Sequence, residues 1–211
     1  NYLIRYFGRQ ICTLPVSLLP GNPSAPADLQ SLRCAVRAQG DGGFVFFNNY
    51  VRHYPTKEHI VRSFSPVQGV TLPVFTLKSG QYGAFVFHRE ICGTRFRYAL
   101  ATRFCTLNEK DCVFWAEEGQ GEIETEGEPA GKVILLSKQD AQNASCFPYA
   151  GMDRLFVTNG EMYASEGGIV LLCGENARLK IYPKPETPPC GFVCTGDDGV
   201  FGLYEKKTDV P

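Results

Sequence analysis

The sequence contains no run of ~18–20 consecutive apolar residues, the length that a helix needs to cross a bilayer. It also lacks an excess of charge of either sign, because 21 Lys and Arg stand against 22 Asp and Glu, for a net charge of −1. A basic excess is the usual mark of a nucleic-acid binder. No Gly-rich phosphate loop and no alternation of strand and helix patterns is present. The sequence therefore predicts neither a membrane nor a nucleic acid as partner, and it excludes a P-loop and a (β/α)₈ barrel.

The chain begins with Asn1 and lacks a charged segment followed by an apolar one, so we expect a piece of a longer polypeptide rather than a secreted precursor. Its nine cysteines are an odd number, whereas small secreted domains carry paired cysteines. This count favours free, mostly buried thiols and a cytoplasmic location. Three residues separate Cys190 from Cys194, which does not match the usual zinc spacings. The sequence predicts no metal ligand and no cofactor.

What the sequence does contain is a series of short runs rich in Val, Ile, Phe, Tyr and Thr, separated by 22 glycines and 14 prolines. This pattern predicts an all-β fold: an antiparallel β-sandwich or barrel-like sheets with many short strands and minimal helix. Helical turns are expected only at 56–62 and at Ser137–Ala144. Three turn signals favour hairpins. They are Gly40-Asp41-Gly42-Gly43, Asn159-Gly160 and Asp197-Asp198-Gly199.

Two charge patterns are candidates for chemistry. The segment 117–128 holds six glutamates and no Lys or Arg, namely Glu117, Glu118, Glu122, Glu124, Glu126 and Glu128. They suggest either a cation site or the two carboxyls of a glycosidase, but a solvated strand face is the favoured interpretation. Arginines alternate with aromatics at Arg95-Phe96-Arg97-Tyr98 and Arg103-Phe104. Strand alternation explains this with aromatics inside and arginines outside, and a stacking platform for single-stranded nucleic acid is the alternative.

Aromatic side chains are the candidates for sugar binding. Trp115 and Tyr82, with Tyr149 and Tyr163, form a candidate platform for the apolar face of a sugar, although a single Trp more often belongs to a core. No cysteine stands in a nucleophile context with His53, His59 or His88, so a thiol enzyme is a third, weaker interpretation. The sequence predicts no catalytic residue.

Three stretches together resemble one family. The first combines NYLIRYFGRQICTLPVSLLP with PADLQSLRCAVRAQGDGGFVFFNNYVRHYP, the second is VTLPVFTLKSGQYGAFVFHREICGTRFRYALATRFCTL, and the third is GIVLLCGENARLKIYP. All three are similar to the β-region that follows the catalytic barrel in bacterial family 35 glycoside hydrolases, the β-galactosidases. The sharpest local match is Asn48-Asn49-Tyr50-Val51-Arg52. In that family the barrel carries both catalytic glutamates, so the resemblance assigns no catalytic residue to this chain.

The resemblance implies a non-catalytic accessory domain of an enzyme that hydrolyses terminal β-galactosides. Residues 1–30 are then a connector from an absent catalytic barrel, 31–207 an all-β accessory domain, and 208–211 the start of the next linker. The sequence leaves open whether the strands divide into two units near 128–148. The expected partners are the missing barrel and a β-galactoside, and exposed apolar residues are expected within 1–12. The alternative is a carbohydrate-binding module with an aromatic platform at Trp115 or Tyr82.

Overall fold

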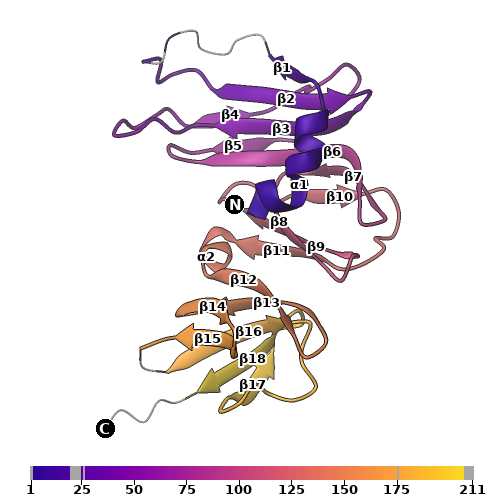
Figure 1. The fold of residues 1–211 in the computed structure, drawn as a ribbon. Coiled ribbons are helices and arrows are strands. Elements are labelled where there is room, and N and C mark those ends of the chain that lie inside the picture. Colours follow the sequence, from indigo (N-terminus) through magenta and orange to yellow (C-terminus); the bar gives the residue numbers. More distant parts are fainter. Residues whose placement is uncertain (1, 20–24, 26, 175, 207–211) are drawn as a thin grey trace. The chain divides into compact units, whose positions relative to one another are not determined.

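The computed structural model describes residues 2–19, 25, 27–174 and 176–206, and the chain forms two compact units, Asn1–Leu135 and Leu136–Pro211 (Figure 1). Strands dominate both units and the strand pairings of known register are all antiparallel, which confirms the all-β prediction. Within the described residues the sheets are open and none closes into a barrel. The strands therefore divide into two units, and the boundary at Leu135 and Leu136 lies within the range 128–148 that the sequence left open.

The first unit is built on a six-stranded sheet with the order β1-β2-β3-β6-β7-β10. Its strands are β1 (Val16–Leu18), β2 (Arg33–Gln39), β3 (Gly42–Asn48), β6 (Tyr82–Ile91), β7 (Thr94–Ala99) and β10 (Ile123–Thr125). Two smaller sheets accompany it: β4 (His59–Val61) with β5 (Phe75–Leu77), and β8 (Thr102–Leu107) with β9 (Asp111–Ala116) and β11 (Val133–Ser137). The expected helical turn at 56–62 is wrong, because this segment contains β4.

Both faces of the six-stranded sheet are buried at its strands β3 and β6, where successive side chains point to opposite faces. On β3, Phe44 belongs to one core cluster and Val45 and Phe47 to another. On β6, Val86 joins the first cluster, and Phe85 and Phe87 join the second. The runs FVFF and AFVF are apolar throughout because each strand supplies both cores.

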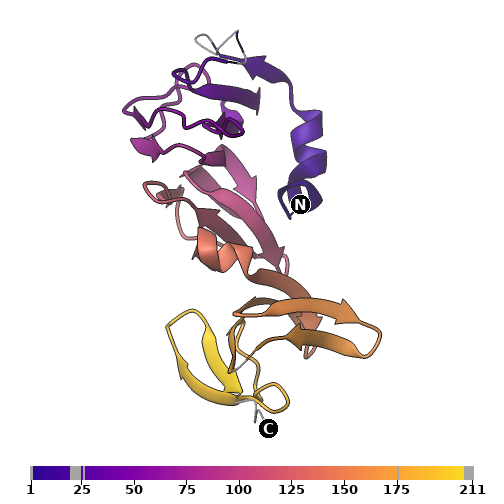
Figure 2. The ribbon, with the colours of Figure 1, turned by 90° about the vertical axis from the view of Figure 1, so that its left-hand side faces the viewer.

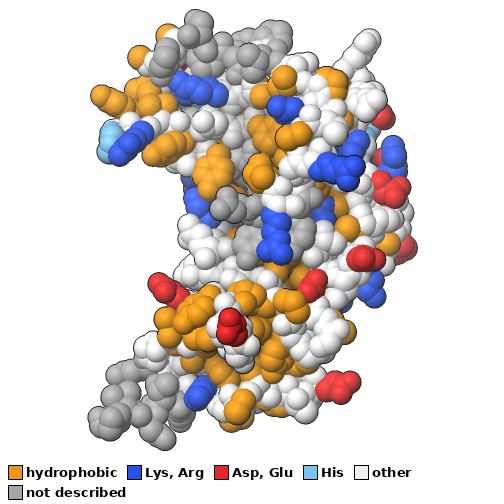
Figure 3. All heavy atoms as spheres, in the orientation of Figure 1, with side chains coloured by type: hydrophobic (Ala, Val, Ile, Leu, Met, Phe, Trp, Pro, Cys, Tyr) orange, Lys and Arg blue, Asp and Glu red, His pale blue; other side chains and the backbone are white. Residues whose placement is uncertain are grey.

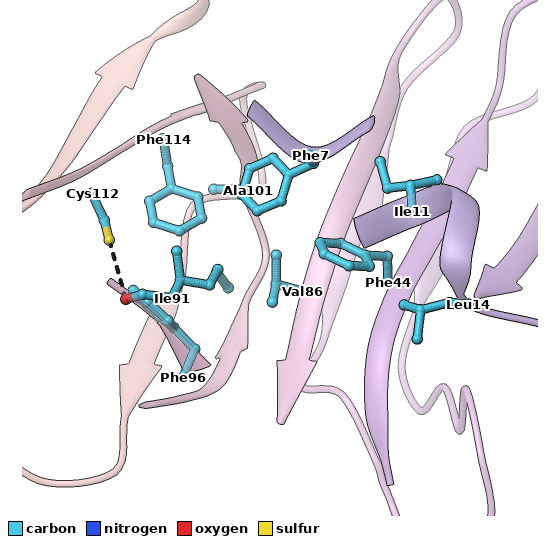
Figure 4. Packing of buried hydrophobic residues seen from close by; sticks show 11 residues of the cluster. Phe7, Ile11, Leu14, Phe44, Val86, Ile91, Phe96, Ala101, Cys112 and Phe114 are labelled. Carbon is cyan, nitrogen blue, oxygen red and sulfur yellow. Dashed lines mark hydrogen bonds between the residues drawn. The ribbon is translucent and has the colours of Figure 1, made fainter. Parts of the chain in front are cut away.

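A helix that the sequence analysis missed covers one of these faces. Helix α1 (Tyr2–Thr13) buries Phe7 and Ile11, and Leu14 follows one turn later, so the apolar residues recur at helical spacing. The three side chains pack in the cluster that contains Phe44 and Phe114 (Figure 4). Figures 1 and 2 both show α1 along one face of the first unit's sheets.

The lead-in segment is therefore more than the expected connector 1–30. Strand β1 pairs with β2, and α1 packs in a core of the first unit. Of the exposed apolar residues expected within 1–12, Ile4 is 65% exposed, whereas Phe7 is buried. Residues 20–24 and 26, in the proline-rich stretch, and the expected linker 208–211 lie outside the described residues.

The second unit is a five-stranded sheet with the order β12-β13-β16-β18-β17, accompanied by the β14–β15 hairpin. Its elements are α2 (Lys138–Gln142), β12 (Ala144–Tyr149), β13 (Met152–Thr158), β14 (Glu161–Ser165), β15 (Gly168–Leu172), β16 (Ala177–Tyr182), β17 (Val193–Asp197) and β18 (Gly202–Lys206). Helix α2 lies within the predicted Ser137–Ala144 segment, and the Ser137 side chain caps it by accepting from the Asp140 N–H. The core is small and centres on Phe156, Leu179, Ile181 and Tyr204.

The three turn signals had different outcomes. Gly40 and Asp41 join β2 to β3, and the φ of +65° at Gly40 suits a two-residue turn with glycine first. The third signal also forms a hairpin, but its loop runs from Asp198 to Phe201 because Asp197 is still paired with Gly202.

The Asn159-Gly160 prediction is wrong. Strand β13, which precedes this pair, bonds to β12 and β16, while β14, which follows it, bonds to β15. The Asn159 side chain instead accepts from the Arg178 N–H at 2.8 Å and donates to the Asn176 carbonyl at 3.1 Å. Gly160 is needed because a Cβ there would collide with the Leu172 carbonyl.

Candidate functional site

The motif that carried the resemblance forms a rigid junction at the end of β3. Asn49 is 2% exposed, although it follows directly after an exposed residue, Asn48. Its side-chain Nδ2 donates to three backbone carbonyls, those of Lys57 (2.8 Å), Leu77 (3.1 Å) and Lys78 (3.0 Å). A buried amide that satisfies several carbonyls fixes the segments that carry them.

The backbone of Asn49 extends this junction. Its N–H donates to the Gln81 carbonyl at 2.9 Å, and its carbonyl accepts from the Gly80 N–H and the Thr56 hydroxyl, each at 2.8 Å. Asn49 thereby joins the end of β3 to two loops that lie seven and about thirty residues further along the chain. The result is a fixed support for the residues that flank it.

Tyr50 and Tyr82 stand on this support and are exposed by 52% and 50%. Together with Asn48 and Gly80 they line an open pocket of about 450 Å³. Trp115, on β9, is half-buried and meets Tyr82 edge to face, with ring centroids 5.9 Å apart and an interplanar angle of 76°. We call these four pocket residues and Trp115 the aromatic surface.

The structure thus brings together the two predicted sugar-contacting residues, Trp115 and Tyr82. The other two candidates lie in the second unit: Tyr149 packs on Phe156 at its core, and Tyr163 is exposed on β14. Tyr50 was missed as an aromatic candidate. The sequence feature that could have identified Tyr50 is its position immediately after the buried strand FVFF and the Asn-Asn pair, where the chain leaves the sheet.

The loop that precedes Tyr82 is held by a second set of contacts. The Gln81 side chain accepts from the Lys78 N–H at 2.7 Å, and the Lys78 ammonium lies 2.8 Å from the Glu118 carboxylate. The Lys78 side chain lowers the pKa of Glu118, and Glu118 raises the pKa of Lys78. These contacts connect the loop to the segment that follows Trp115.

The acidic segment is a solvated strand face at Glu122, Glu124 and Glu126, as favoured, whereas Glu117 is buried. Glu124 and Glu126 form ion pairs with Arg97 and Arg95 across the β10–β7 pairing, the latter with 2.8 Å between Glu126 Oε2 and Arg95 Nε. Glu122 accepts from the Tyr98 hydroxyl at 2.5 Å. Burial and these two neighbouring carboxylates, Glu122 and Glu124, raise the pKa of Tyr98. The acidic residues therefore serve as partners for their neighbouring strand.

The arginine pattern is only partly as predicted. Phe96 is fully buried, and Arg95 and Arg97 point to solvent. Arg103, however, is 3% exposed, which contradicts the expectation that it faces outward. Its guanidinium lies 4.2 Å from the centroid of the Phe7 ring, so the missed helix α1 provides the face that covers it.

The cysteines also differ from the expectation of mostly buried thiols. All nine are free, but only Cys105 and Cys112 are buried, and Cys12, Cys190 and Cys194 are exposed. Among the described residues, no group of three or more His, Cys, Asp or Glu side chains is placed to hold a metal ion. His88 pairs with Asp41 at 3.0 Å rather than with a cysteine.

A second pocket, of about 410 Å³, lies within the second unit between α2 and the strands β16 and β18. Its charged side chains pair with one another: Lys180 with Asp140 at 3.3 Å, and Arg178 with Glu205 at 3.4 Å. Because these charges are already neutralised by neighbours, this pocket is less suited to a charged ligand than its composition suggests.

In the described part of the chain, no helix is both long and apolar enough to cross a membrane. No protein-family model and no curated protein matches the sequence. The aromatic surface therefore has to be interpreted from its own geometry.

Proposed function

We propose that this chain is a non-catalytic accessory β-region of a β-galactosidase-like glycoside hydrolase that acts on terminal β-galactosides. The observation that carries the proposal is the Asn49 junction. The Asn48-Asn49-Tyr50 motif, which is the sharpest point of resemblance to that family, sits where one buried amide fixes two loops and presents aromatic side chains. A rigid, aromatic loop cluster of this kind suits the rim of a neighbouring catalytic domain.

The carboxyl groups of this chain support the non-catalytic assignment. A glycosidase needs a carboxylic acid whose pKa is raised, so that it holds a proton near neutral pH. The shifted carboxyl groups Asp28, Asp41 and Glu118 all have lowered pKa values, through a hydrogen bond from Ser31, His88 and Lys78, respectively. Glu124 of β10 and the flanking Glu122 and Glu126 are engaged by the arginines and the tyrosine of β7.

Two measurements test this proposal. The isolated chain is expected not to release the chromophore from a nitrophenyl β-galactoside, and turnover that disappears on replacing one internal glutamate would refute the proposal. The gene sequence upstream of Asn1 is expected to encode an alternating strand–helix barrel. An upstream region without such a barrel would equally refute it.

The aromatic surface favours a second candidate function, binding of a galactose-containing saccharide. Aromatic faces pack on the C–H-rich face of a pyranose, and Tyr50 and Tyr82 expose half of their surface at one pocket. Trp115 is the only tryptophan of the chain and contacts Tyr82, so its fluorescence reports on this site alone.

The test is a fluorescence titration with β-galactosyl oligosaccharides. A saturable change is expected, and Tyr82→Ala is expected to weaken binding by up to ~10-fold, because an aromatic contact contributes ~0.5–1.5 kcal/mol. Tyr163→Ala, which removes an exposed tyrosine of the second unit, is the matched control and should leave binding unchanged. No response up to millimolar saccharide, or equal losses in both variants, would exclude saccharide binding at this surface.

A further inference from the structure

Arg103 is a buried cation whose environment contains thiols in place of a carboxylate. Its side chain donates to Thr106 Oγ1 and, at 3.6 Å, to Cys92 Sγ, while its Nε has no hydrogen-bond partner. Among the described residues, no Asp or Glu forms an ion pair with it. A buried charge without a counter-ion is costly. Burial lowers the pKa of Arg103, and Cys112, Cys92 and Cys105 nearby act to raise it.

Cys92 is placed to supply the missing negative charge. It stands in the two-residue turn between β6 and β7, with φ at +52°, and it is partly accessible to solvent. Its sulfur lies 3.7 Å from Thr106 Oγ1 as well as 3.6 Å from the Arg103 guanidinium. The Cys112 thiol, the Thr106 hydroxyl and the Arg103 charge together lower the pKa of Cys92 to about 5, against the opposing effect of burial.

Cys112 is the second thiol of this cluster and has the opposite character. It is fully buried on β9, opposite Thr106, the residue whose hydroxyl lies 3.7 Å from Cys92 Sγ. Its thiol donates to the carbonyl of Ile91, the residue before Cys92, at 3.7 Å (Figure 4). Its hydrogen bond with Cys92, followed by burial, raises its pKa. One sulfur is therefore an accessible thiolate, and its neighbour is a protonated thiol behind it. Dithiol redox sites divide the roles of attacking and resolving cysteine in this way.

We propose that Cys92 and Cys112 form a redox-active pair that is oxidised by low-molecular-weight disulfides of the glutathione type. The Cys92 thiolate attacks one sulfur of the disulfide, which forms a mixed disulfide and expels one thiolate. The Cys112 sulfur then attacks Cys92, the Cys92–Cys112 bond forms, and the second thiol leaves with the Cys112 proton. Overall, the protein dithiol loses two electrons and the small disulfide gains them. This site is separate from the aromatic surface and does not depend on the function proposed above.

The first test measures the alkylation rate of each cysteine by iodoacetamide and peptide mapping between pH 6.5 and 8.5. An ordinary thiol with a pKa of ~8.5 should react ~50-fold faster at the upper end, because its thiolate fraction grows by that factor. The rate at Cys92 should change by less than about twofold, and the rate at exposed Cys190 is measured alongside it as the reference. A Cys92 rate that rises in parallel with that of Cys190 would overturn the proposal.

The second test exposes the protein to oxidised glutathione. The intact protein should form an internal Cys92–Cys112 disulfide that a reductant reverses, and Cys112→Ala should instead retain glutathione on Cys92. Cys173→Ala, which removes a half-buried cysteine of the second unit, is the matched control and should behave like the parent protein. Glutathione retained on Cys92 of the parent protein, or spread evenly over the exposed cysteines, would refute a resolving role for Cys112.

A pair of arginine variants tests the role of the buried charge. Arg103→Lys keeps the charge and should preserve the flat pH profile of Cys92, whereas Arg103→Met should make the rate rise with pH. If Arg103→Met fails to fold, the Lys variant and the parent profile still decide the matter. A flat profile in a folded Arg103→Met variant, or a steep one in Arg103→Lys, would show that Arg103 does not hold the thiolate.

Discussion

The two units bury their apolar residues in different ways. In the first unit, a six-stranded sheet has apolar side chains on both faces, and each face has its own cluster with many fully buried side chains. In the described part of the second unit, the main cluster has four buried residues, and much of the apolar surface around it is only half-buried. Leu155, Tyr182 and Phe201 are also buried, outside this cluster. Hydrophobic side chains gather on its visible surface near β14 and β15, where Tyr163 and Leu172 are about half exposed (Figure 3).

This difference has an energetic consequence. Hydrophobic stabilisation grows with the apolar area removed from water. A domain of fewer than about 80 residues rarely obtains more than ~3–5 kcal/mol from a single core. The second unit falls in this size range, whereas the first has two cores. We therefore expect the second unit to unfold at a lower denaturant concentration.

The largest effect is expected for Phe85→Ala in the first unit. Phe85 is fully buried and contacts the rings of both Phe47 and Phe75. Its loss should cost about 3–5 kcal/mol of unfolding free energy. Urea unfolding followed by Trp115 fluorescence measures this, because the only tryptophan lies in the first unit. A cost below 1 kcal/mol would mean that the two-faced packing does not stabilise this unit as we argue.

The corresponding change in the second unit is Ile181→Ala. Ile181 is fully buried, and the substitution should cost about 2–5 kcal/mol, which is comparable with the whole stability expected for this unit. Hydrogen exchange should then show loss of protection in β13, β16 and β18, while the Trp115 unfolding curve stays where it was. If hydrogen exchange in these strands stays unchanged, the proposed difference in stability between the two units is wrong.

A smaller effect is expected at the Asn49 junction. Asn49→Ala leaves the buried carbonyl of Leu77 without its side-chain donor and should cost about 1–3 kcal/mol. The neighbouring Asn48→Ala is the matched control, because Asn48 is exposed and accepts only from the Tyr50 N–H. If the two variants lose equal stability, the junction is not what fixes these loops.

The smallest effect concerns the Lys78–Glu118 pair, which is largely exposed. The pKa of Glu118 is lowered in the folded state, so its contribution is present above pH ~4.3 and is lost as the pH falls through the folded pKa. The pKa of Lys78 is raised in the folded state, so the contribution of Lys78 to stability is lost as the pH rises through its own folded pKa. Glu118→Gln should therefore lower the melting temperature slightly near pH 7 at low salt, and not at high salt.

The control for this pair is Glu128→Gln, which removes an exposed carboxylate that has no ion-pair partner among the described residues. It should leave the melting temperature unchanged at both salt concentrations. A salt-dependent loss of equal size in both variants would point to the overall charge of the chain rather than to the Lys78–Glu118 contact.

Alternation and turn chemistry were sufficient to predict the class of this fold. Val45 and Phe47 alternate with Phe44 on a strand that enters from a glycine turn, and these local features belong to the sequence itself. Helix α1 was predictable too, because Phe7 and Ile11 lie four residues apart, but the aromatic composition of the segment masked the helical period. The Asn159-Gly160 error has another origin: a turn signal does not encode which strand each neighbour will join.

The sequence by itself determined that this chain is built of short antiparallel strands, because side-chain alternation and glycine φ angles act over a few residues. Only the tertiary structure decided which distant segments share a surface. It placed Tyr82 against Trp115, gathered two loops on Asn49, and turned Arg103 inward to meet Cys92 beneath α1. The physical reason is that such contacts depend on strand order and burial across tens of residues, which no local pattern of side chains specifies.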